Sequence, residues 1–494
     1  MQTQVVHAPA SRPTAKTAVV AHAQAAVLAA ALPLPDPPSP MRPSHIVVFN
    51  RAGRGPINAV AKNMSMSAHA VKGRKGVTAF FAMAGDPGSP GKSGKPGKSS
   101  AVGISALPGV AMARAYERVG AMAATLTPAQ ATQVAHMPDV AGVFVNEVRS
   151  IPKPVRQSVN VARAPSGAGS EVQLAYLRGM RDAVQLAIDA AMGGTATSPA
   201  RRADAVVATA ALQLSWCLQQ IGITAKYRRA TGKGIRVAVL DTGIDRTHPD
   251  LVARIAAYRN FAAGSSDQDV VEHGTHCAGV IGAAKSPTTG VRYSVAPSCQ
   301  LLVGKVLDDN GNGFDDDILE AIDWALDEGA RVISMSLVSK RPAGGAASNA
   351  YELVASNLFD LPNGALLVAA AGNESSRPGL VAPVCNPAAC ASIMSVAAVD
   401  RDFNVAEFSC GKVDAIGAID MSGPGVDVLS AQPGGRAQLM SGTSMATPHV
   451  AGVAALFAQR HPTFTPRQLW AKIQETARNL GKPNDCGSGM VQVP

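Results

Sequence analysis

Short, continuous hydrophobic runs alternate with helical patterns in the second half of the chain. The strand-like runs have no regular polar alternation and cover residues 235–240, 301–307, 331–337, 366–371 and 393–399. Such runs are typical of parallel strands that are covered on both faces. Between them, residues 315–329 form an amphipathic helical pattern with acids in its first turn and glycine at its end. The alternation predicts an α/β fold, doubly wound around a mainly parallel sheet.

A smaller α/β unit is predicted in front of this sheet. Residues 45–50 and 140–146 read as short strands, and a helix begins between them at Thr127. The stretch Thr127-Pro-Ala-Gln130 places a capping threonine, a proline in the first turn and a glutamine three residues on. Glycine recurs at every third residue of 85–97, but this repeat is too short for a collagen triple helix and predicts a flexible basic insert.

Helical periodicity returns between the two units. Residues 170–192 carry apolar residues at helical spacing, and a second helical stretch follows Gly193-Gly194 to about residue 213. These helices either pack on the second unit or serve as a linker.

Composition and charge add two expectations for the front of this chain of 494 residues. Residues 17–34 are rich in Ala, Val and Leu after Arg12 and Lys16, which is typical of a signal peptide or signal anchor, but no run is long enough to span a membrane. Residues 1–230 contain 25 Lys/Arg and 9 Asp/Glu, whereas residues 231–494 contain 20 and 26. Because the front lacks interleaved aromatic residues and any nucleic-acid motif, its charge favours docking on the acidic rear half.

Three polar residues stand where an α/β sheet builds its sites. Asp241 ends a predicted strand, His273 precedes a small apolar helical pattern, and Ser444 opens the apolar run 445–457. A buried acid, an imidazole and a serine hydroxyl at a helix N-terminus are the parts of a nucleophilic acyl-transfer site. On local chemistry alone Asp245 is an equally good acid, His276 an equally good base, and Ser444 a simple helix cap.

Taken together, in the order Asp, His, Ser, these stretches resemble the subtilisin-like serine proteases. The motifs that carry the resemblance are Gly232-Lys-Gly-Ile-Arg-Val-Ala-Val-Leu-Asp-Thr-Gly-Ile, Thr247-His-Pro-Asp-Leu251, His273-Gly-Thr-His-Cys-Ala-Gly279, Ala369-Ala-Ala-Gly-Asn373 and Gly442-Thr-Ser-Met-Ala-Thr-Pro-His449. The resemblance implies a serine endopeptidase with Asp241, His273 and Ser444 as its triad and Asn373 in its oxyanion hole.

The same resemblance implies how substrate binds. An extended peptide would pair as an added strand with segments that contain Gly311, Gly313, Ser336, Leu337 and Gly372. Val338 departs from the family, which usually has glycine there, so its bulk either restricts the neighbouring pocket or shifts the backbone.

The resemblance also implies that the protein is made as a precursor that processes itself and is secreted, either outside the cell or into the periplasm. Its predicted parts are a leader at 1–44, an inhibitory propeptide-like domain at 45–150 with the Gly-rich insert at 85–99, a helical linker or insertion at 151–213, and a catalytic domain at 214–494. The expected partners are protein substrates and the chain's own propeptide, without nucleic acid or membrane insertion. The alternatives are a catalytically silent peptide-binding scaffold of the same fold, and a cytoplasmic enzyme.

No cofactor is required by this resemblance, and calcium is allowed as a structural ion. Asp250 matches a calcium position of some family members, although the loop after Gly282 lacks the usual asparagine. The acids at 308–309 and 315–317 could form a second calcium site, but we expect them to belong to a solvated loop and a solvated helix N-terminus.

Of the seven cysteines, Cys385 and Cys390 are spaced for a local disulfide, and Cys277 is expected to be a packed small hydrophobe.

Overall fold

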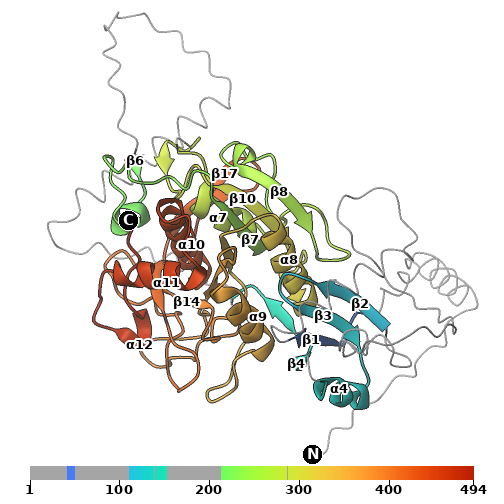
Figure 1. The fold of residues 1–494 in the computed structure, drawn as a ribbon. Helices are drawn as coiled ribbons and strands as arrows, with labels where there is room; N and C mark the ends of the chain where they lie inside the picture. Colours follow the sequence, from blue (N-terminus) through green and yellow to red (C-terminus); the bar gives the residue numbers. More distant parts are fainter. Residues whose placement is uncertain (1–41, 50–110, 138–139, 153–212, 286) are drawn as a thin grey trace, which may run out of the picture.

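The structure is a computed structural model that describes residues 42–49, 111–137, 140–152, 213–285 and 287–494 (Figure 1). The predicted leader, the Gly-rich insert and the helices expected within 151–213 lie outside the described residues. Two units are described below: an N-terminal module, residues 42–152, and a main domain, residues 213–494.

A seven-stranded sheet forms the centre of the main domain. Its strand order is β15-β14-β13-β12-β7-β10-β8, and every neighbouring pair is parallel. The strands are β7 Arg236–Asp241, β8 Ile255–Asn260, β10 Gln300–Lys305, β12 Val332–Met335, β13 Leu366–Ala370, β14 Met394–Val399 and β15 Met421–Pro424. The predicted doubly wound α/β fold is confirmed, and the five predicted strands are all present with ends that differ by one or two residues.

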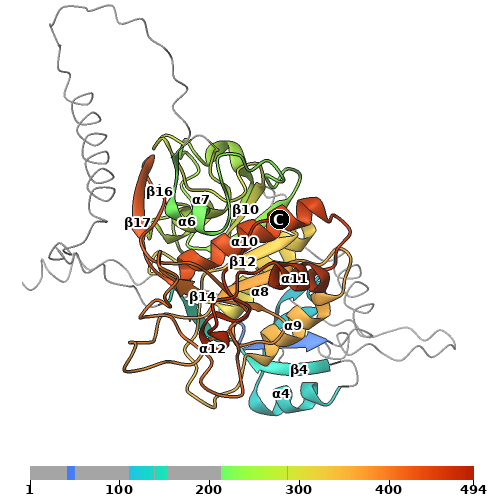
Figure 2. The same ribbon diagram turned by 90° about the vertical axis from the view of Figure 1, so that its left-hand side faces the viewer.

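Helices cover both faces of this sheet. Along β7, Val237 and Val239 pack into one hydrophobic layer while Ala238 and Leu240 pack into the other. The first layer contains α6 Trp216–Gln220, α7 His273–Gly282, α10 Thr443–Arg460 and α11 Pro466–Glu475, and Figure 2 shows α10 lying across the sheet. The second layer contains α8 Asp315–Asp327 and α9 Asn349–Phe359.

Short elements complete the main domain at its edges. They are β6 Gln213–Leu214 paired with β9 Val291–Arg292, the 3-10 turn η2 Val252–Arg254, the hairpin β16 Val428–Gln432 and β17 Arg436–Met440, and α12 Pro483–Cys486.

The described residues of the N-terminal module form an antiparallel sheet and one helix. Its strands are β1 His45–Phe49, β2 Ala111–Tyr116, β3 Ala121–Thr125 and β4 Val140–Val145, in the order β2-β3-β1-β4. The predicted helix is α4 Pro128–Ala135, and Thr127 and Gln130 form the predicted capping box.

Both faces of this small sheet are buried. Ile46 and Val48 of β1 pack into the layer that contains α8 and α9, whereas Val47 and Phe49 pack in a separate cluster with Val134 of α4. Figure 1 shows the module beside α8 and α9. The second hydrophobic layer of the main domain, which contains α8 and α9, therefore continues into the module.

Ion pairs reinforce this contact, as the uneven charge of the chain predicts. Arg114 lies 2.7 Å from Asp317 and 2.8 Å from Glu320, and Arg42 lies 2.6 Å from Asp317. These arginines belong to the module and the acids to α8, so opposite charges meet across the contact.

A substitution at Gly274 tests how closely α7 approaches the loop after β7. A Cβ atom on Gly274 would lie 2.2 Å from the Gly243 carbonyl oxygen, so Gly274→Ala must displace backbone. We expect this substitution to lower the free energy of unfolding by about 1–3 kcal/mol, measured by urea denaturation of the Ser444→Ala chain. Gly379→Ala is the matched control, because its Cβ meets nothing closer than 3.6 Å. Equal stability of the two variants would contradict the close approach.

Candidate active site

Asp241 and His273 meet at the carboxyl edge of the sheet. Asp241 is the last residue of β7 and His273 is the first residue of α7. The distance from His273 Nδ1 to Asp241 Oδ1 is 2.7 Å, and the Thr242 N–H donates to the same oxygen at 2.7 Å. Both side chains are buried, so little water competes for this hydrogen bond.

The pKa of His273 reflects this buried pair. Burial alone would lower the pKa, but the Asp241 carboxylate outweighs it and raises the pKa well above 6.5. The carboxylate therefore stabilises the imidazolium form of His273. That is the form which a general base reaches after it accepts a proton.

The two competing residues lie in other environments. His276 Nε2 lies 2.9 Å from the Val428 carbonyl oxygen, and burial lowers the pKa of His276 to about 3. The Asp245 carboxylate accepts hydrogen bonds from the Thr247 N–H and hydroxyl and from the Gly434 N–H. Neither residue takes part in the Asp241–His273 contact, so the geometry favours the latter pair.

Ser444 is the second residue of α10, at the end that approaches α7. Its carbonyl oxygen accepts a hydrogen bond of 2.9 Å from the Ser336 hydroxyl. Cys277 Sγ lies 3.5 Å from the same oxygen and 3.9 Å from His273 Nδ1. Ser336, which follows β12, and Cys277, which lies in α7, thus hold the start of α10 beside His273.

Asn373 is anchored to the residue before Ser444. Its side-chain oxygen accepts hydrogen bonds from the Thr443 N–H at 2.9 Å and from the Thr443 hydroxyl at 2.8 Å. This pairing turns the carboxamide nitrogen away from Thr443. A Cβ atom built on Gly442 would lie 3.2 Å from Asn373 Nδ2 and 3.6 Å from the Ser444 nitrogen, so these two nitrogens border one small space.

A strand of the N-terminal module lies in the predicted substrate cleft. It is β5 Val148–Ser150, which pairs antiparallel with β11 Asn312–Phe314. Ser150 and Val338 exchange two backbone hydrogen bonds of 2.9 and 2.7 Å, and the Ile151 N–H donates to the Gly311 carbonyl oxygen at 3.1 Å. The backbone of Val338 therefore still pairs with an extended chain.

The other predicted binding residues have different surroundings in the structure. Gly313 is opposite Arg149 in the strand register, and Leu337 is fully buried next to Val338. Gly372 has φ +111°, and its N–H donates to the Thr443 hydroxyl at 3.2 Å. Gly372 thus belongs to the structure that supports Asn373.

Comparison with known proteins decides the family. The model of the subtilase family matches residues 232–489. The chain is 40% identical over 293 residues to M-protease of Shouchella clausii (strain KSM-K16), covering 59% of this chain and 71% of that protein. It is 42% identical over 280 residues to a thermostable alkaline protease of Halalkalibacterium halodurans, covering 56% and 72%. It is 40% identical over 286 residues to subtilisin Savinase of Lederbergia lenta, covering 57% and 98%.

The chain belongs to the subtilase family. It is a serine endopeptidase, as the sequence motifs imply. No helix in the described parts of this subtilase has the length and apolar character needed to cross a membrane.

The carboxylate of Asp250, the suggested calcium position, is hydrogen-bonded within the main domain. The Asp250 carboxylate accepts hydrogen bonds from the Tyr293 hydroxyl at 2.6 Å and from the Thr288 N–H at 2.8 Å. Both carboxylate oxygens of Asp250 therefore already have a donor within the chain. Within the described ranges, the one His/Cys/Asp/Glu group with metal-ligand spacing is Asp241, His273 and Cys277, which is the candidate active site itself.

The acids at the start of α8 are not solvated, and that prediction is wrong. Asp315, Asp316 and Asp317 are 0–2% exposed because the N-terminal module covers them. Arg42, Arg114 and Arg149 contact them, and Asn146 donates to Asp316 at 3.0 Å. The positive charges of the module's arginines therefore balance these carboxylates in place of a cation or water.

The predicted Cys385–Cys390 disulfide is also wrong. All seven cysteines are described, and all are free and buried. Cys390 Sγ lies 3.2 Å from the Ser348 carbonyl oxygen, whereas the Cys385 thiol hydrogen-bonds to Cys410, which raises the pKa of Cys385 and lowers that of Cys410. A tight turn, in which the Ala389 N–H donates to the Cys385 carbonyl oxygen, separates the two side chains. The packed state expected for Cys277 is found, and burial raises its pKa.

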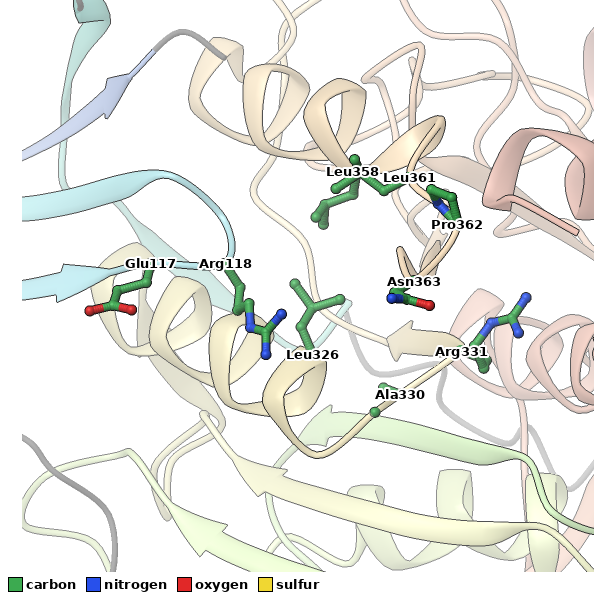
Figure 3. Close-up of a pocket in the computed structure, with 10 residues that line it drawn as sticks. Glu117, Arg118, Leu326, Ala330, Arg331, Leu358, Leu361, Pro362 and Asn363 are labelled. Carbon is green, nitrogen blue, oxygen red and sulfur yellow. The ribbon is translucent and has the colours of Figure 1, made fainter. Parts of the chain in front are cut away.

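A cavity of about 620 Å³ lies at the contact between the module and the main domain, away from the candidate site. Its lining comes from the turn between β2 and β3 and from the ends of α8 and α9 (Figure 3). None of its ten lining residues is a predicted site residue. This cavity therefore lies outside the candidate site.

Two functional contacts were not predicted from the sequence. Thr443 stands inside a recognised motif, but only the fold shows that its hydroxyl holds Asn373. Arg149 follows a predicted strand as an isolated basic residue, and nothing nearby in the sequence indicates that it is buried against Asp315.

The Asp241–His273 pair predicts a measurable titration. In the full chain with Ser444→Ala, His273 should titrate above pH 6.5, and Asp241→Asn should move its pKa below 6.5 because burial then dominates. Nitrogen-resolved NMR of the imidazole rings measures both values. His276 is the internal control and should stay neutral in both chains above pH 5. An unchanged His273 pKa in Asp241→Asn would show that this carboxylate is not its main partner.

Proposed function

We propose that this subtilase hydrolyses peptide bonds through an acyl-enzyme on Ser444, with His273 as general base and Asp241 as its orienting acid. The observation that carries the proposal is the buried 2.7 Å contact between Asp241 and His273 beside the start of α10. Asp241 accepts from Nδ1, which leaves Nε2 of the neutral ring as the proton acceptor.

The chemical steps follow from these roles. The Ser444 hydroxyl oxygen attacks the substrate carbonyl carbon while His273 takes the hydroxyl proton. Collapse of the tetrahedral intermediate breaks the peptide bond, and His273 returns the proton to the leaving amine. A water molecule then attacks the acyl-enzyme by the same route and releases the second product.

Asn373 is assigned to the oxyanion hole in this proposal. The negative oxygen of the tetrahedral intermediate needs donors that are already in place. Asn373 Nδ2 and the Ser444 N–H border one space beside Gly442, and the double hydrogen bond from Thr443 fixes the orientation of the carboxamide.

Substrate is proposed to bind as an extended strand between β11 and the segment 336–338. The support is that β5 pairs in this way with Gly313 and Val338, and that Ile151, the residue after β5, bonds to Gly311 through its backbone. Backbone pairing does not depend on the side chains of the peptide, so other sequences can take the same path.

The N-terminal module is proposed to be an inhibitory propeptide that the enzyme removes from itself. Its support is that β5 occupies the cleft while the module packs on α8 and α9. Self-processing would free the cleft by a cut beyond Ile151. Secretion, to the outside or the periplasm, belongs to this proposal and rests on the Ala/Val/Leu-rich stretch at 17–34; fractionation of tagged cells distinguishes it from a cytoplasmic enzyme.

The oxyanion role predicts a coupled loss of rate. Asn373→Ala should lower kcat by about 100- to 1000-fold with little change in KM. Thr443→Val removes one of the two donors to Asn373 and should lower kcat by about fivefold, but should have no effect in the Asn373→Ala background. Thr447→Val, one turn further along α10, is the control and should change kcat less than twofold. Additive losses for Asn373 and Thr443 would exclude this positioning role.

The test of the function is the intact mass of the purified chain. Wild type should lose its N-terminal part during expression or incubation, while the Ser444→Ala chain should stay full length. Ser441→Ala, three residues upstream on the same loop, is the matched control and should process like wild type. The new N-terminus locates the cut. A wild-type chain that stays intact and cleaves no added protein would favour the silent peptide-binding scaffold.

A further inference from the structure

The side chain of Arg149 enters a closed pocket of the main domain. Arg149 lies on β5, and its side chain has no exposed surface. Its Nε donates to Asp315 Oδ1 at 2.7 Å and its Nη2 to Asp315 Oδ2 at 2.9 Å. This is a bidentate ion pair between a guanidinium and a carboxylate.

The receiving groups belong to the main domain and hold one another. Asp315 begins α8, and the Tyr351 hydroxyl of α9 donates to Asp315 Oδ1 at 3.0 Å. The Arg149 guanidinium carbon lies 5.2 Å from the centre of the Tyr351 ring, within the range of a cation–π contact. Ser348 adds its hydroxyl 3.4 Å from Nη2. Because Tyr351 lies in α9 of the main domain, its hydrogen bond to Asp315 does not depend on β5.

The position of this side chain is set by backbone pairing. Arg149 stands opposite Gly313, and the next residue, Ser150, exchanges two hydrogen bonds with Val338. Any peptide that pairs in the same way places one side chain in the pocket. It is the residue directly before the one that pairs with Val338.

Arginine satisfies this pocket best. A buried carboxylate without a positive partner is costly, and an apolar side chain would leave Asp315 with only neutral donors, the Tyr351 hydroxyl and the Glu147 N–H. Lysine supplies the charge but neither the planar fork nor an equal stacking surface. A glutamate or aspartate would add a second negative charge.

We propose that Asp315, Tyr351 and Ser348 form a specificity pocket that selects an arginine of the protein substrate at the position before the partner of Val338. Arg149 is then the chain's own occupant of that pocket. The inference rests on the proposed peptidase function and names the substrate feature that this function favours. The competing explanation is that Arg149 and Asp315 only hold the N-terminal module in place.

The first test does not require catalysis. In the full chain with Ser444→Ala, hydrogen exchange at the Ser150 and Ile151 amides reports how firmly β5 stays in the cleft, since both amides bond to the main domain. Arg149→Gln and Asp315→Asn should each speed this exchange by about 30-fold, and the double variant no more than either alone. Arg149→Lys should fall between. Arg118→Gln is the control, because its ion pair with Asp327 is exposed, and should change exchange less than about twofold. Unchanged or additive rates would overturn the pocket.

The second test separates substrate selection from a role in the precursor alone. Wild-type enzyme that has processed itself is given a proteome-derived peptide library, and the products are sequenced by mass spectrometry. Arginine should be enriched at one fixed distance before the cut, and Asp315→Asn should abolish the enrichment. Internally quenched peptides with arginine or its neutral isostere citrulline at that position should then differ by about 30-fold in kcat/KM.

The outcomes of these tests distinguish the two proposals. Cleavage without arginine preference overturns the specificity pocket and leaves the peptidase function standing, even if the exchange data support the Arg149–Asp315 pair. Absence of any cleavage overturns both the peptidase function and the substrate selection that rests on it. The exchange data then still decide whether the pocket binds arginine.

Discussion

The hydrogen bond between Asp241 and His273 depends on the carboxyl edge of a parallel sheet. In such a sheet all strands end at the same side, and the neighbours β7, β12 and β13 bring Asp241, Ser336 and Asn373 to one edge. The helices α7 and α10 begin at this edge and add His273 and Ser444. Each helix N-terminus also turns unpaired backbone N–H groups toward the site, where negative charge develops during acyl transfer. The sheet, not any one loop, therefore gathers residues that are far apart in the chain.

The second constraint is the close contact between backbones around this edge. The loop after β7 approaches α7 so closely that Gly274 has no space for a side chain, and Gly313 approaches the Val306 carbonyl oxygen in the same way. Small residues at these positions let the histidine helix and the cleft strand approach the sheet. This agrees with a chain that has only 4% aromatic residues.

The N-terminal module uses both apolar packing and charge to hold its position. Its sheet continues the hydrophobic layer over α8 and α9, while its arginines pair with the acids that the module itself buries. Buried ion pairs contribute modestly to net stability, but they penalise any misplaced docking because each unpaired charge is costly. The acids of α8 thus favour one register of the module, and that register places β5 in the cleft.

Much of this account could be predicted from local patterns. The apolar run before Asp241 predicts its strand end, and the capping residues at Thr127 predict the start of α4 within one residue. The choice of His273 over His276 could not come from local chemistry, because both lie in the same helix and only the packing directs one toward Asp241. The burial of Asp315 and the partner of Cys385 depend on segments distant in the sequence, and no local spacing encodes them.

The most direct measurement is covalent labelling with an organophosphorus fluoridate, followed by peptide mapping, of enzyme that has lost its N-terminal module. The His273→Ala and Asp241→Asn chains, which should not process themselves, are first cleaved by added wild-type enzyme that is then removed. The account predicts one label per chain, on Ser444, with labelling abolished in His273→Ala and strongly slowed in Asp241→Asn. A label on another residue, or equal labelling of Ser444 in His273→Ala, would contradict the claim that this histidine activates this serine.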